Sequence, residues 1–393
     1  MRDSPPPGAW SSALIATVVG FGGTIALVVQ AARTLGASSE QTGSAVMALC
    51  LAIALGGAVL SIQTRMPVVL AWSTPGAALL AASSGASWPV AIGVFICAAA
   101  MGLALAAVPV LGRWAGKIPA SIAAAMLAGV LLPFCLNLFR LGAVDPLLVA
   151  ALVAIYVAAR QRMAVYALLL VLAAGLALTL ARGDVEPLPA GRVIGALIPV
   201  APSFQAAAAI GLALPLFLVT LVSQNLPGLA VLRSAGYSPP ARRLLAGAGL
   251  VSLAAAPFGG HAVNLAAITA AICTSDDAHP DRHRRWTVGV VYAGFYLVLA
   301  IFSPFLVRLF LALPAGAVAA LTGIALIPAL AGSLKSMLDA PSDLDAALVT
   351  FLATASGLSV LGLGSAFWGL VAGFAALAIS RLLRARRPRF TAS

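Results

Sequence analysis

The chain has 393 residues, of which 62% are apolar and only 9% are charged. This composition excludes a soluble globular domain, because apolar runs of about 20 residues, each long enough to cross the hydrocarbon core of a bilayer, follow one another along the chain. The net charge of +12 comes mostly from basic residues in ones and twos at the ends of these runs. It therefore indicates orientation in a membrane and not a nucleic-acid partner.

The apolar runs predict an all-α polytopic membrane protein with about 14 transmembrane segments. The expected spans are 11–32, 41–62, 67–84, 89–111, 119–138, 145–159, 164–181, 204–229, 242–256, 258–274, 287–307, 314–331, 344–361 and 363–383. The first run is too long for the apolar part of a signal peptide, so we expect it to remain as a span. The longest connection, 182–203, divides the spans into seven and seven. An odd number in each half requires the second half to run upside down relative to the first.

Basic residues also predict the orientation of the chain. With a cytoplasmic amino terminus, all but five of the 23 Lys and Arg residues fall on the cytoplasmic side. We therefore expect both termini in the cytoplasm and the protein in a bacterial inner membrane. The basic tail from Arg381 to Arg389 fits this topology, with contact to anionic lipid as the alternative. No cofactor or metal is predicted, because the four cysteines lie in or at the end of apolar runs without metal-ligand spacing.

The third run departs from a plain apolar helix. Pro67 stands at its entry, and Ser73, Thr74, Pro75 and Gly76 stand in its middle. Ser and Thr followed by Pro are typical of a helix start, and the residues before Ser73 favour extended backbone. We expect a short extended segment and then a half-helix that begins near the middle of the membrane.

The tenth run has a matching break. Gly259 and Gly260 precede a helix-forming stretch, so we expect a second half-helix that starts near His261. Backbone groups freed inside a bilayer are tolerated only where protein or a water-filled cavity satisfies them, so paired breaks indicate a binding site. Two helix amino ends aimed at the centre would favour an anion there. The alternative is a pair of kinks that only aid packing.

Few polar residues remain in the apolar runs. His261 is the only histidine in one, and it is predicted to bind substrate or to take a proton. The alternative is a neutral imidazole bonded to a carbonyl on a neighbouring span. Asn264, three residues later, would lie on nearly the same helical face. Gln224 and Asn225 precede Pro227 and Gly228, and they are either ligand contacts or interhelical hydrogen-bonding groups.

Aromatic side chains near the breaks offer a surface for a ring. Phe21, Trp72 and Phe258 could stack on an aromatic ligand, although a single aromatic residue in a span often only packs.

An internal repeat supports the division into halves, which we expect to cover residues 1–200 and 201–393. Four residues recur 195 positions later, and a second block at 32–38 resembles 232–238. The four pairs are Pro109 and Pro304, Arg113 and Arg308, Pro119 and Pro314, and Pro133 and Pro328. A duplication of this size in a membrane chain suggests two halves that rock about a shared site, as in many secondary transporters.

Three segments carry a family resemblance. SQNLPGLAVLRSAGY (223–237), PFGGHAVNLAAITAAI (257–272) and HPDRHRRW (279–286) resemble the benzoate/proton symporter (BenE) family. That family is similar in architecture to nucleobase permeases and to sulfate/bicarbonate anion transporters. The resemblance implies inverted repeats in which spans 1–4 and 8–11 form a core and spans 5–7 and 12–14 form a gate. It places the substrate between the third and tenth spans, and by analogy it suggests a homodimer.

One departure from the nucleobase permeases bears on the cargo. Those proteins carry carboxylates in the eighth and tenth spans, whereas the matching stretches here offer Gln224, Asn225, His261 and Asn264. A pocket without fixed negative charge suits an anion better than a neutral base. A proton carried along would remove the electrical cost of moving an anion into the cell, about 2.3 kcal/mol per 100 mV. His261 is the first candidate for the proton, and the substrate carboxylate is the second.

The expected function is therefore proton-coupled symport of benzoate or a related aromatic carboxylate, by an elevator-like movement of the core against the gate. The predicted substrate-binding residues are Trp72, Ser73, Thr74, Pro75, Gly76, Gln224, Asn225, Phe258, Gly259, Gly260, His261 and Asn264. The alternatives keep the fold and change the cargo to a nucleobase or an inorganic anion. A channel is less favoured. So is a membrane-embedded enzyme, because the sequence has no HExxH motif, no paired intramembrane aspartates and no cysteine and histidine ligand set.

Overall fold

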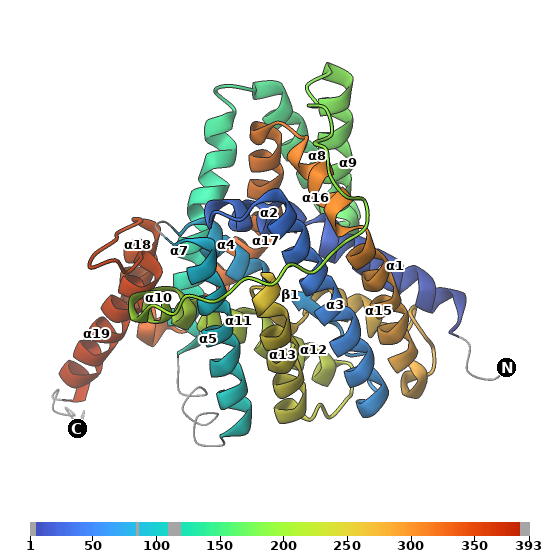
Figure 1. The fold of residues 1–393 in the computed structure, drawn as a ribbon. Coiled ribbons are helices and arrows are strands. Elements are labelled where there is room, and N and C mark those ends of the chain that lie inside the picture. Colours follow the sequence, from blue (N-terminus) through green and yellow to red (C-terminus); the bar gives the residue numbers. More distant parts are fainter. Residues whose placement is uncertain (1–4, 84–85, 109–118, 386–393) are drawn as a thin grey trace.

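The computed structural model describes residues 5–83, 86–108 and 119–385, and these residues are mostly α-helical (Figure 1). Pro109 and Arg113 of the first repeat block, and Arg386, Arg387 and Arg389 of the basic tail, lie outside the described residues. Eight helices in the described part are long and apolar enough to cross a membrane. A ninth candidate is a helix pair bent by 65° at residue 302. The helical polytopic class is thus confirmed, whereas the count of fourteen spans stays a prediction.

In the described part of the first half, three helices precede the strand and five follow it. Its elements are α1 (Pro7–Gly22), α2 (Ile25–Thr34), α3 (Ser39–Thr64), β1 (Leu70–Trp72), α4 (Thr74–Ala81), α5 (Trp88–Ala107), α7 (Ala120–Leu141), α8 (Pro146–Arg162) and α9 (Ala167–Arg182).

The second half begins with a helix that contains two π-helical turns, Ala209–Ala213 and Leu221–Asn225. Its elements are α10 (Ala206–Ala208), α11 (Leu214–Thr220), α12 (Leu226–Ser234), α13 (Ala241–Ala255), β2 (Val263–Leu265), α14 (Ile268–Cys273), α15 (Trp286–Ile301), α16 (Ser303–Leu311), α17 (Ala315–Leu338), α18 (Leu344–Ala355) and α19 (Ser365–Ala385).

The first predicted span is not one straight helix. α1 ends at Gly22 and α2 begins at Ile25, after Gly23 and Thr24. The Thr24 hydroxyl donates to the carbonyl of Gly20 at 2.7 Å, which occupies an acceptor near the end of α1. Two adjacent glycines lower the helix propensity at this point, and hydropathy alone does not register the break.

The second repeat block has the same local structure in both halves. Gly36 and Gly236 follow α2 and α12 with φ of +80° and +82°. In each case the next N–H, of Ala37 or Tyr237, donates to a carbonyl five residues back at 3.0 Å. This left-handed helix end is the reason that glycine recurs at the two positions.

Helices from the two halves are interleaved. α3 packs along α15, and α5 packs along α13, so each of these pairs joins one helix of each half. α7 packs along α17 in the same way, whereas α18 and α19 form an arm at one side (Figure 1). In the expected duplication, α3 corresponds to α13 and α5 corresponds to α15. Exchanging the halves therefore converts the pair α3 and α15 into the pair α13 and α5, which is the pattern expected of inverted repeats.

The connection between the halves lies on the molecular surface. Residues 183–205 cross the front of the view in Figure 1 without regular structure. Backbone N–H groups of this segment donate to α3 at Ser44 Oγ (from Ile198, 2.9 Å), to α15 at the carbonyl of Ile301 (from Gly195, 2.7 Å), and to the start of α5 (from Ser203, 2.8 Å). The connection is therefore attached to the helices predicted to form the core.

Candidate functional site

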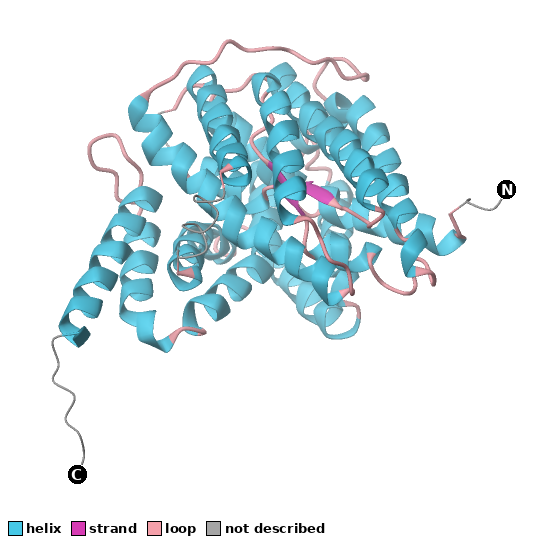
Figure 2. Cartoon of the chain, turned by 90° about the horizontal axis from the view of Figure 1, so that it is seen from below, coloured by secondary structure: helices cyan, strands magenta, loops and turns pink. Residues whose placement is uncertain are grey.

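Two extended segments meet at the centre of the molecule. β1 and β2 pair antiparallel, with Ala71 opposite Asn264, and helices surround them on all sides (Figure 2). Two further backbone bonds extend the pairing, from Ser73 N–H to the carbonyl of Ala262 at 3.0 Å and from Ala266 N–H to the carbonyl of Val69 at 2.9 Å. The pairing satisfies backbone groups that would otherwise be unpaired inside a membrane.

Ser73 links the two breaks. Its hydroxyl accepts from the N–H of Gly76 at 3.0 Å, which caps α4, and it also shares a hydrogen bond of 2.8 Å with the Thr220 hydroxyl. Its carbonyl lies 3.0 Å from Nε2 of His261. A carbonyl only accepts, so Nε2 of His261 carries the proton. Ser73 and His261, predicted from separate spans, are thus in direct contact.

Trp72 is committed to packing. Its indole N–H donates to Thr24 Oγ1 at 2.8 Å, and its ring lies 5.3 Å from that of Phe21 and 6.4 Å from that of Tyr296, centre to centre. The side chain is only 2% exposed. In this conformation Trp72 supports the break between α1 and α2 and offers no free face to a ligand.

Asn225 lies in the second π-helical turn and holds the end of β2. Its side-chain oxygen accepts from the N–H of Leu265 at 2.9 Å. Gln224, its neighbour in the same turn, is half-buried. The π-helical geometry inserts an extra residue into the helix at this point, a feature that is frequent at functional sites.

The expected start of the second half-helix near His261 is wrong. Residues 261–266 form no helix and include β2, and α14 begins only at Ile268. His261 and Asn264 therefore do not share a helical face. This segment stays extended because it pairs with β1. That pairing is a tertiary contact, which local sequence does not reveal. Asn264 is fully buried, and no described group bonds to its side-chain oxygen or nitrogen.

The two glycines of this break are required by packing within the protein. A Cβ on Gly259, whose φ is +96°, would lie 2.6 Å from the ring of Trp88. A Cβ on Gly260 would lie 2.6 Å from the Cβ of Ala255. Phe258 is half-buried, and its carbonyl accepts from the Ser44 hydroxyl at 3.1 Å. These residues shape the turn before β2.

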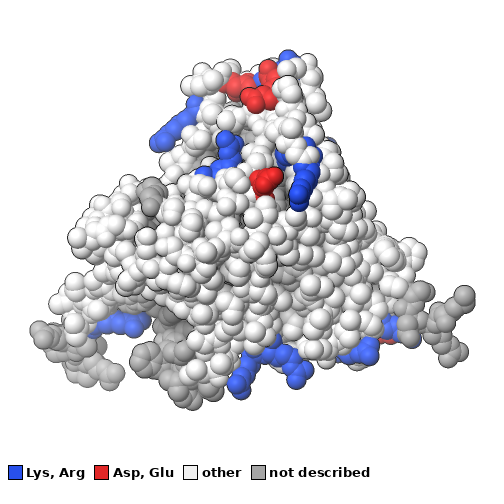
Figure 3. Space-filling model, viewed as in Figure 1, with Lys and Arg blue, Asp and Glu red and all other residues white. Residues whose placement is uncertain are grey.

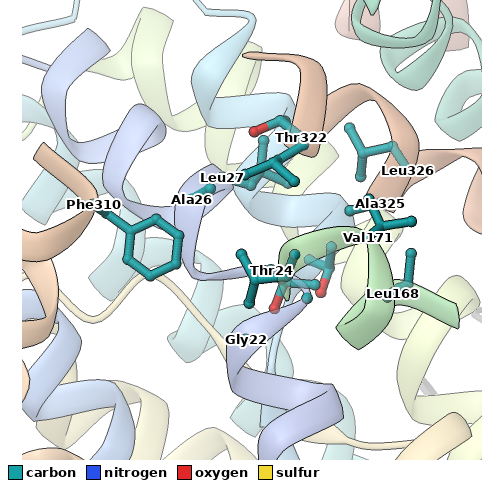
Figure 4. Close-up of a pocket in the computed structure, with 14 residues that line it drawn as sticks. Gly22, Thr24, Ala26, Leu27, Leu168, Val171, Phe310, Thr322, Ala325 and Leu326 are labelled. Atoms are coloured by element: carbon teal, nitrogen blue, oxygen red, sulfur yellow. The ribbon is translucent and has the colours of Figure 1, made fainter. Parts of the chain in front are cut away.

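A small cavity of about 20 Å³ lies beside the start of α4. Its lining comes from the break between α1 and α2, from Thr74, and from α9, α16 and α17 (Figure 4). It therefore lies between helices predicted as core and helices predicted as gate. The lining residues are Gly22, Gly23, Thr24, Ala26, Leu27, Thr74, Leu168, Val171, Leu172, Phe310, Leu321, Thr322, Ala325 and Leu326.

The polar groups of this cavity are hydroxyls and helix ends. α2 and α4 both begin at its wall, and the first N–H groups of a helix have no acceptor within it. Thr322 also lines the cavity. This residue is 2% exposed, and its hydroxyl has no hydrogen-bond partner among the described residues. Among the described residues, no charged side chain lines the cavity. Two positive dipole ends, donor hydroxyls and apolar walls together suit a small anion with an apolar body.

Thr74 is the only predicted site residue that lines this cavity. Sequence reasoning missed Thr24, Phe310 and Thr322. The glycine pair before Thr24 was an available signal of the break. Phe310 and Thr322 carry no such signal, because only the packing of α16 and α17 brings them to the cavity.

Sequence comparisons match the chain to one family of membrane proteins and to two bacterial relatives. The family described as benzoate membrane transport protein (BenE) matches residues 4–379. The chain is 39% identical over 386 residues to the inner membrane protein YdcO of Escherichia coli, covering 98% of both chains. It is 37% identical over 363 residues to the benzoate membrane transport protein of Acinetobacter baylyi, covering 92% of both.

Two solved structures with the same fold are of anion transporters. The transmembrane domain of the cyanobacterial bicarbonate transporter BicA superposes with a TM-score of 0.59 at 15% identity, covering 96% of this chain and 95% of that one. Murine Slc26a9, in the inward-facing state, gives 0.61 at 14% identity and covers 99% of this chain and 70% of that one. At these identities the likeness shows the fold alone.

Proposed function

The chain belongs to the benzoate membrane transport protein family, and from that premise we propose that it transports benzoate or a closely related aromatic carboxylate. Membership makes it a multi-pass membrane transporter and not an enzyme. A relative is named an inner membrane protein, which supports the same location here. The proposed orientation has both termini in the cytoplasm.

The observation that carries the proposal is the cavity at the starts of α2 and α4. A carboxylate can accept from the hydroxyls of Thr74 and Thr322, while a benzene ring lies against Phe310 and the leucine side chains. The space is only about 20 Å³ in this conformation, so the proposal requires the core and the gate to separate before the ring enters. The absence of charged lining residues favours an anion with a hydrophobic body over a neutral base.

The strand and helix junctions complete the proposed site. The start of α4 consists of Ser73, Thr74, Pro75 and Gly76. The other predicted residues of the third, eighth and tenth spans lie in or close to β1 and β2. We propose that these residues hold the two junctions in place and that a part of them reaches the substrate in another conformation. Support comes from the hydrogen bonds that tie Ser73 to Thr220 and His261.

Proton coupling is proposed for the same centre. His261 is the first candidate for the proton because it is buried and donates to the residue that caps α4. A proton on His261 would add a positive charge near the start of α4 and so favour the carboxylate. The substrate carboxylate itself is the second candidate.

An elevator-like movement is the proposed mechanism. The core would comprise α1–α5 and α10–α16, and the gate would comprise α7–α9 and α17–α19. The interleaving of α3 with α15 and of α5 with α13 supports a core that moves as one body, and the packing of α7 on α17 supports a separate gate. The cavity between these two groups is where such a movement would carry a substrate.

The test is uptake of labelled benzoate into liposomes that contain the purified protein, with and without an inward proton gradient. The proposal expects accumulation that depends on the gradient and is blocked by excess unlabelled benzoate. Uracil and bicarbonate in equal excess should not block it. If either of them competes and benzoate does not, the cargo is a nucleobase or an inorganic anion. Uptake that never exceeds equilibrium would contradict symport.

A further inference from the structure

A buried arginine on α16 has no acidic partner. Arg308 is 8% exposed, and among the residues that the structure describes it forms no ion pair. Asp184 and Glu186, the acidic residues of the connection between the halves, are exposed. A charge removed from water is costly unless it is paired, so an unpaired, buried guanidinium in a membrane protein is a candidate anion site.

One edge of this guanidinium is unpaired. Nη1 of Arg308 donates to the carbonyl of Pro189 at 2.8 Å. Nε is buried, and neither Nε nor Nη2 has a hydrogen-bond partner in the described part of the chain. Nε and Nη2 share one edge of the group, and their N–H bonds point the same way. This is the edge that binds both oxygens of a carboxylate with two parallel hydrogen bonds.

Residues 189–191 of the connection, here called the strap, cover the side chain. A Cβ on Gly191 would lie 3.1 Å from Cδ and 3.5 Å from Nε of Arg308, so glycine lets the backbone approach this closely. The connection is anchored before and after the strap, by bonds from the N–H of Glu186 to Ala312 and from the N–H of Gly195 to Ile301. Between these anchors, no backbone N–H donates to a described group. The strap can therefore move away from Arg308 while both anchors stay in place.

The position of Arg308 on α16 relates it to the cavity beside α4. Phe310, two residues later, lines that cavity. Two residues turn a helix by about 200°, so Arg308 and Phe310 lie on opposite sides of α16. Figure 3 shows Lys and Arg side chains beside acidic ones in the upper part of the molecule, the region in which Figure 1 draws α16. An anion that approaches α16 from the side of the connection therefore meets exposed basic groups first.

We propose that Arg308 and the strap form a binding site for the carboxylate of the cargo, on the side of α16 that faces the connection. The strap covers this site in the present conformation. When residues 189–191 move away, Nε and Nη2 of Arg308 donate to the two carboxylate oxygens, and the cargo is held there before it reaches the cavity on the other side of α16. The inference rests on the proposed function, because it takes the cargo to be a carboxylate.

The first experiment measures the rate at which phenylglyoxal, a reagent for guanidinium groups, modifies Arg308 in liposomes that contain the full chain. Modified peptides are quantified by mass spectrometry. Saturating benzoate should slow the modification of Arg308 by a factor of about five or more. Benzamide, which has the same ring without the charge, should not slow it, and sodium chloride at equal ionic strength should protect much less than benzoate. Arg192, which is exposed on the same connection, is the internal control, and its rate should not change.

Variants test the same site by transport. Arg308→Gln removes both the charge and the edge, and it should lower kcat/KM for benzoate uptake about ten-fold, the equivalent of ~1.4 kcal/mol. Arg308→Lys keeps the charge without the edge and should give an intermediate value. Arg192→Gln is the matched control, because it removes one positive charge from the connection and should leave kcat/KM unchanged. Labelling of the unaltered chain decides the question if Arg308→Gln does not fold.

Three outcomes would overturn the site. Arg308 could react equally fast with and without benzoate, or it could stay unmodified while Arg192 reacts, which would mean that the strap never uncovers the edge. Equal protection by chloride would make this a general anion site and not one for the cargo. The proposed function fails separately: if the unaltered chain takes up no benzoate but benzoate still protects Arg308, the site stands and the transport proposal does not.

Discussion

The imidazole of His261 connects the two half-helix junctions through a single hydrogen bond. Because Nε2 donates to the carbonyl of Ser73, Nδ1 is the nitrogen that can take up a second proton. The ring of Phe95 lies 6.3 Å away, centre to centre, and the side chain is 4% exposed. Protonation would therefore create a charge in apolar surroundings, which a bound carboxylate nearby would stabilise.

His261→Gln should separate proton coupling from transport. Glutamine keeps an N–H donor for Ser73 but cannot carry a proton at physiological pH. At an inward gradient of one pH unit, the unaltered protein should accumulate benzoate up to about ten-fold, because one unit corresponds to about 1.36 kcal/mol per proton. The variant should equilibrate benzoate without accumulating it, while exchange of internal for external benzoate continues. Normal accumulation at every pH would make His261 a structural residue and leave the substrate to carry the proton.

Thr322→Val should change stability and affinity in opposite directions. The Thr322 hydroxyl is buried without a partner, so replacing it with a methyl group should raise the free energy of unfolding by about 1 kcal/mol. If the hydroxyl donates to the carboxylate, KM for benzoate should rise about ten-fold, the equivalent of ~1.5 kcal/mol. Thr354→Val is the matched control, because Thr354 is equally buried and unpartnered but lies outside the cavity. An unchanged KM in Thr322→Val would remove Thr322 from the site.

At the level of single residues, the sequence predicted which residues lie at the two breaks better than it predicted what their side chains contact. Ser73 and His261 were predicted as site residues from different spans, and the structure places them in contact. Trp72 was predicted to face the ligand but donates to Thr24 instead. The direction of a side chain depends on which helices pack around it, and that information is not local in sequence.

The sequence predicted where the two helices break, but it did not predict where the helix after the second break begins. Ser73 followed by Thr74 and Pro75 has the chemistry of a helix start, and α4 begins there. At the second break, local sequence favours a helix directly after Gly260, but pairing with β1 delays it to Ile268. Strand pairing joins residues almost two hundred positions apart, so no local pattern could reveal it.

The hairpin of α8 and α9 is predicted to weaken in acid. Asp145 caps the start of α8 and forms an ion pair of 2.5 Å with Arg182 at the end of α9. The bond to Arg182, together with that to the N–H of Leu148, lowers the pKa of the Asp145 carboxyl below its usual 3.8. A carboxyl with a lowered pKa stabilises the fold above its unfolded pKa, and the effect is lost as pH falls through the folded value.

Asp145→Asn tests this pair. The variant should unfold at a slightly lower temperature than the unaltered protein near neutral pH, and the two midpoints should converge below about pH 3.8. The difference should be small, because both side chains are about a third exposed and the pair is screened by solvent. A difference that persists unchanged in acid would assign the effect to the cap on α8 rather than to the charge.

At the scale of the whole molecule, sequence predicted the class and the duplication. Pro119 and Pro314 precede α7 and α17, and Pro133 and Pro328 lie inside the same two helices, so the spacing of 195 residues relates equivalent positions. The interleaving of the halves was implied only by the family resemblance, because hydropathy identifies which segments are apolar and not which segments pack together.

The proposed movement of core against gate makes a prediction for a disulfide between them. A Cβ on Gly211, in the eighth span, would lie 3.6 Å from the Cβ of Leu363, before α19, which suits a disulfide. In a chain without its native cysteines, oxidation of the Gly211→Cys, Leu363→Cys pair should abolish benzoate uptake, and reductant should restore it. The control pair, Gly43→Cys with Pro304→Cys, lies within the core at 3.5 Å and should leave uptake unchanged. Full uptake with the first bridge formed would mean that these surfaces do not slide, and transport would then require a movement inside the core.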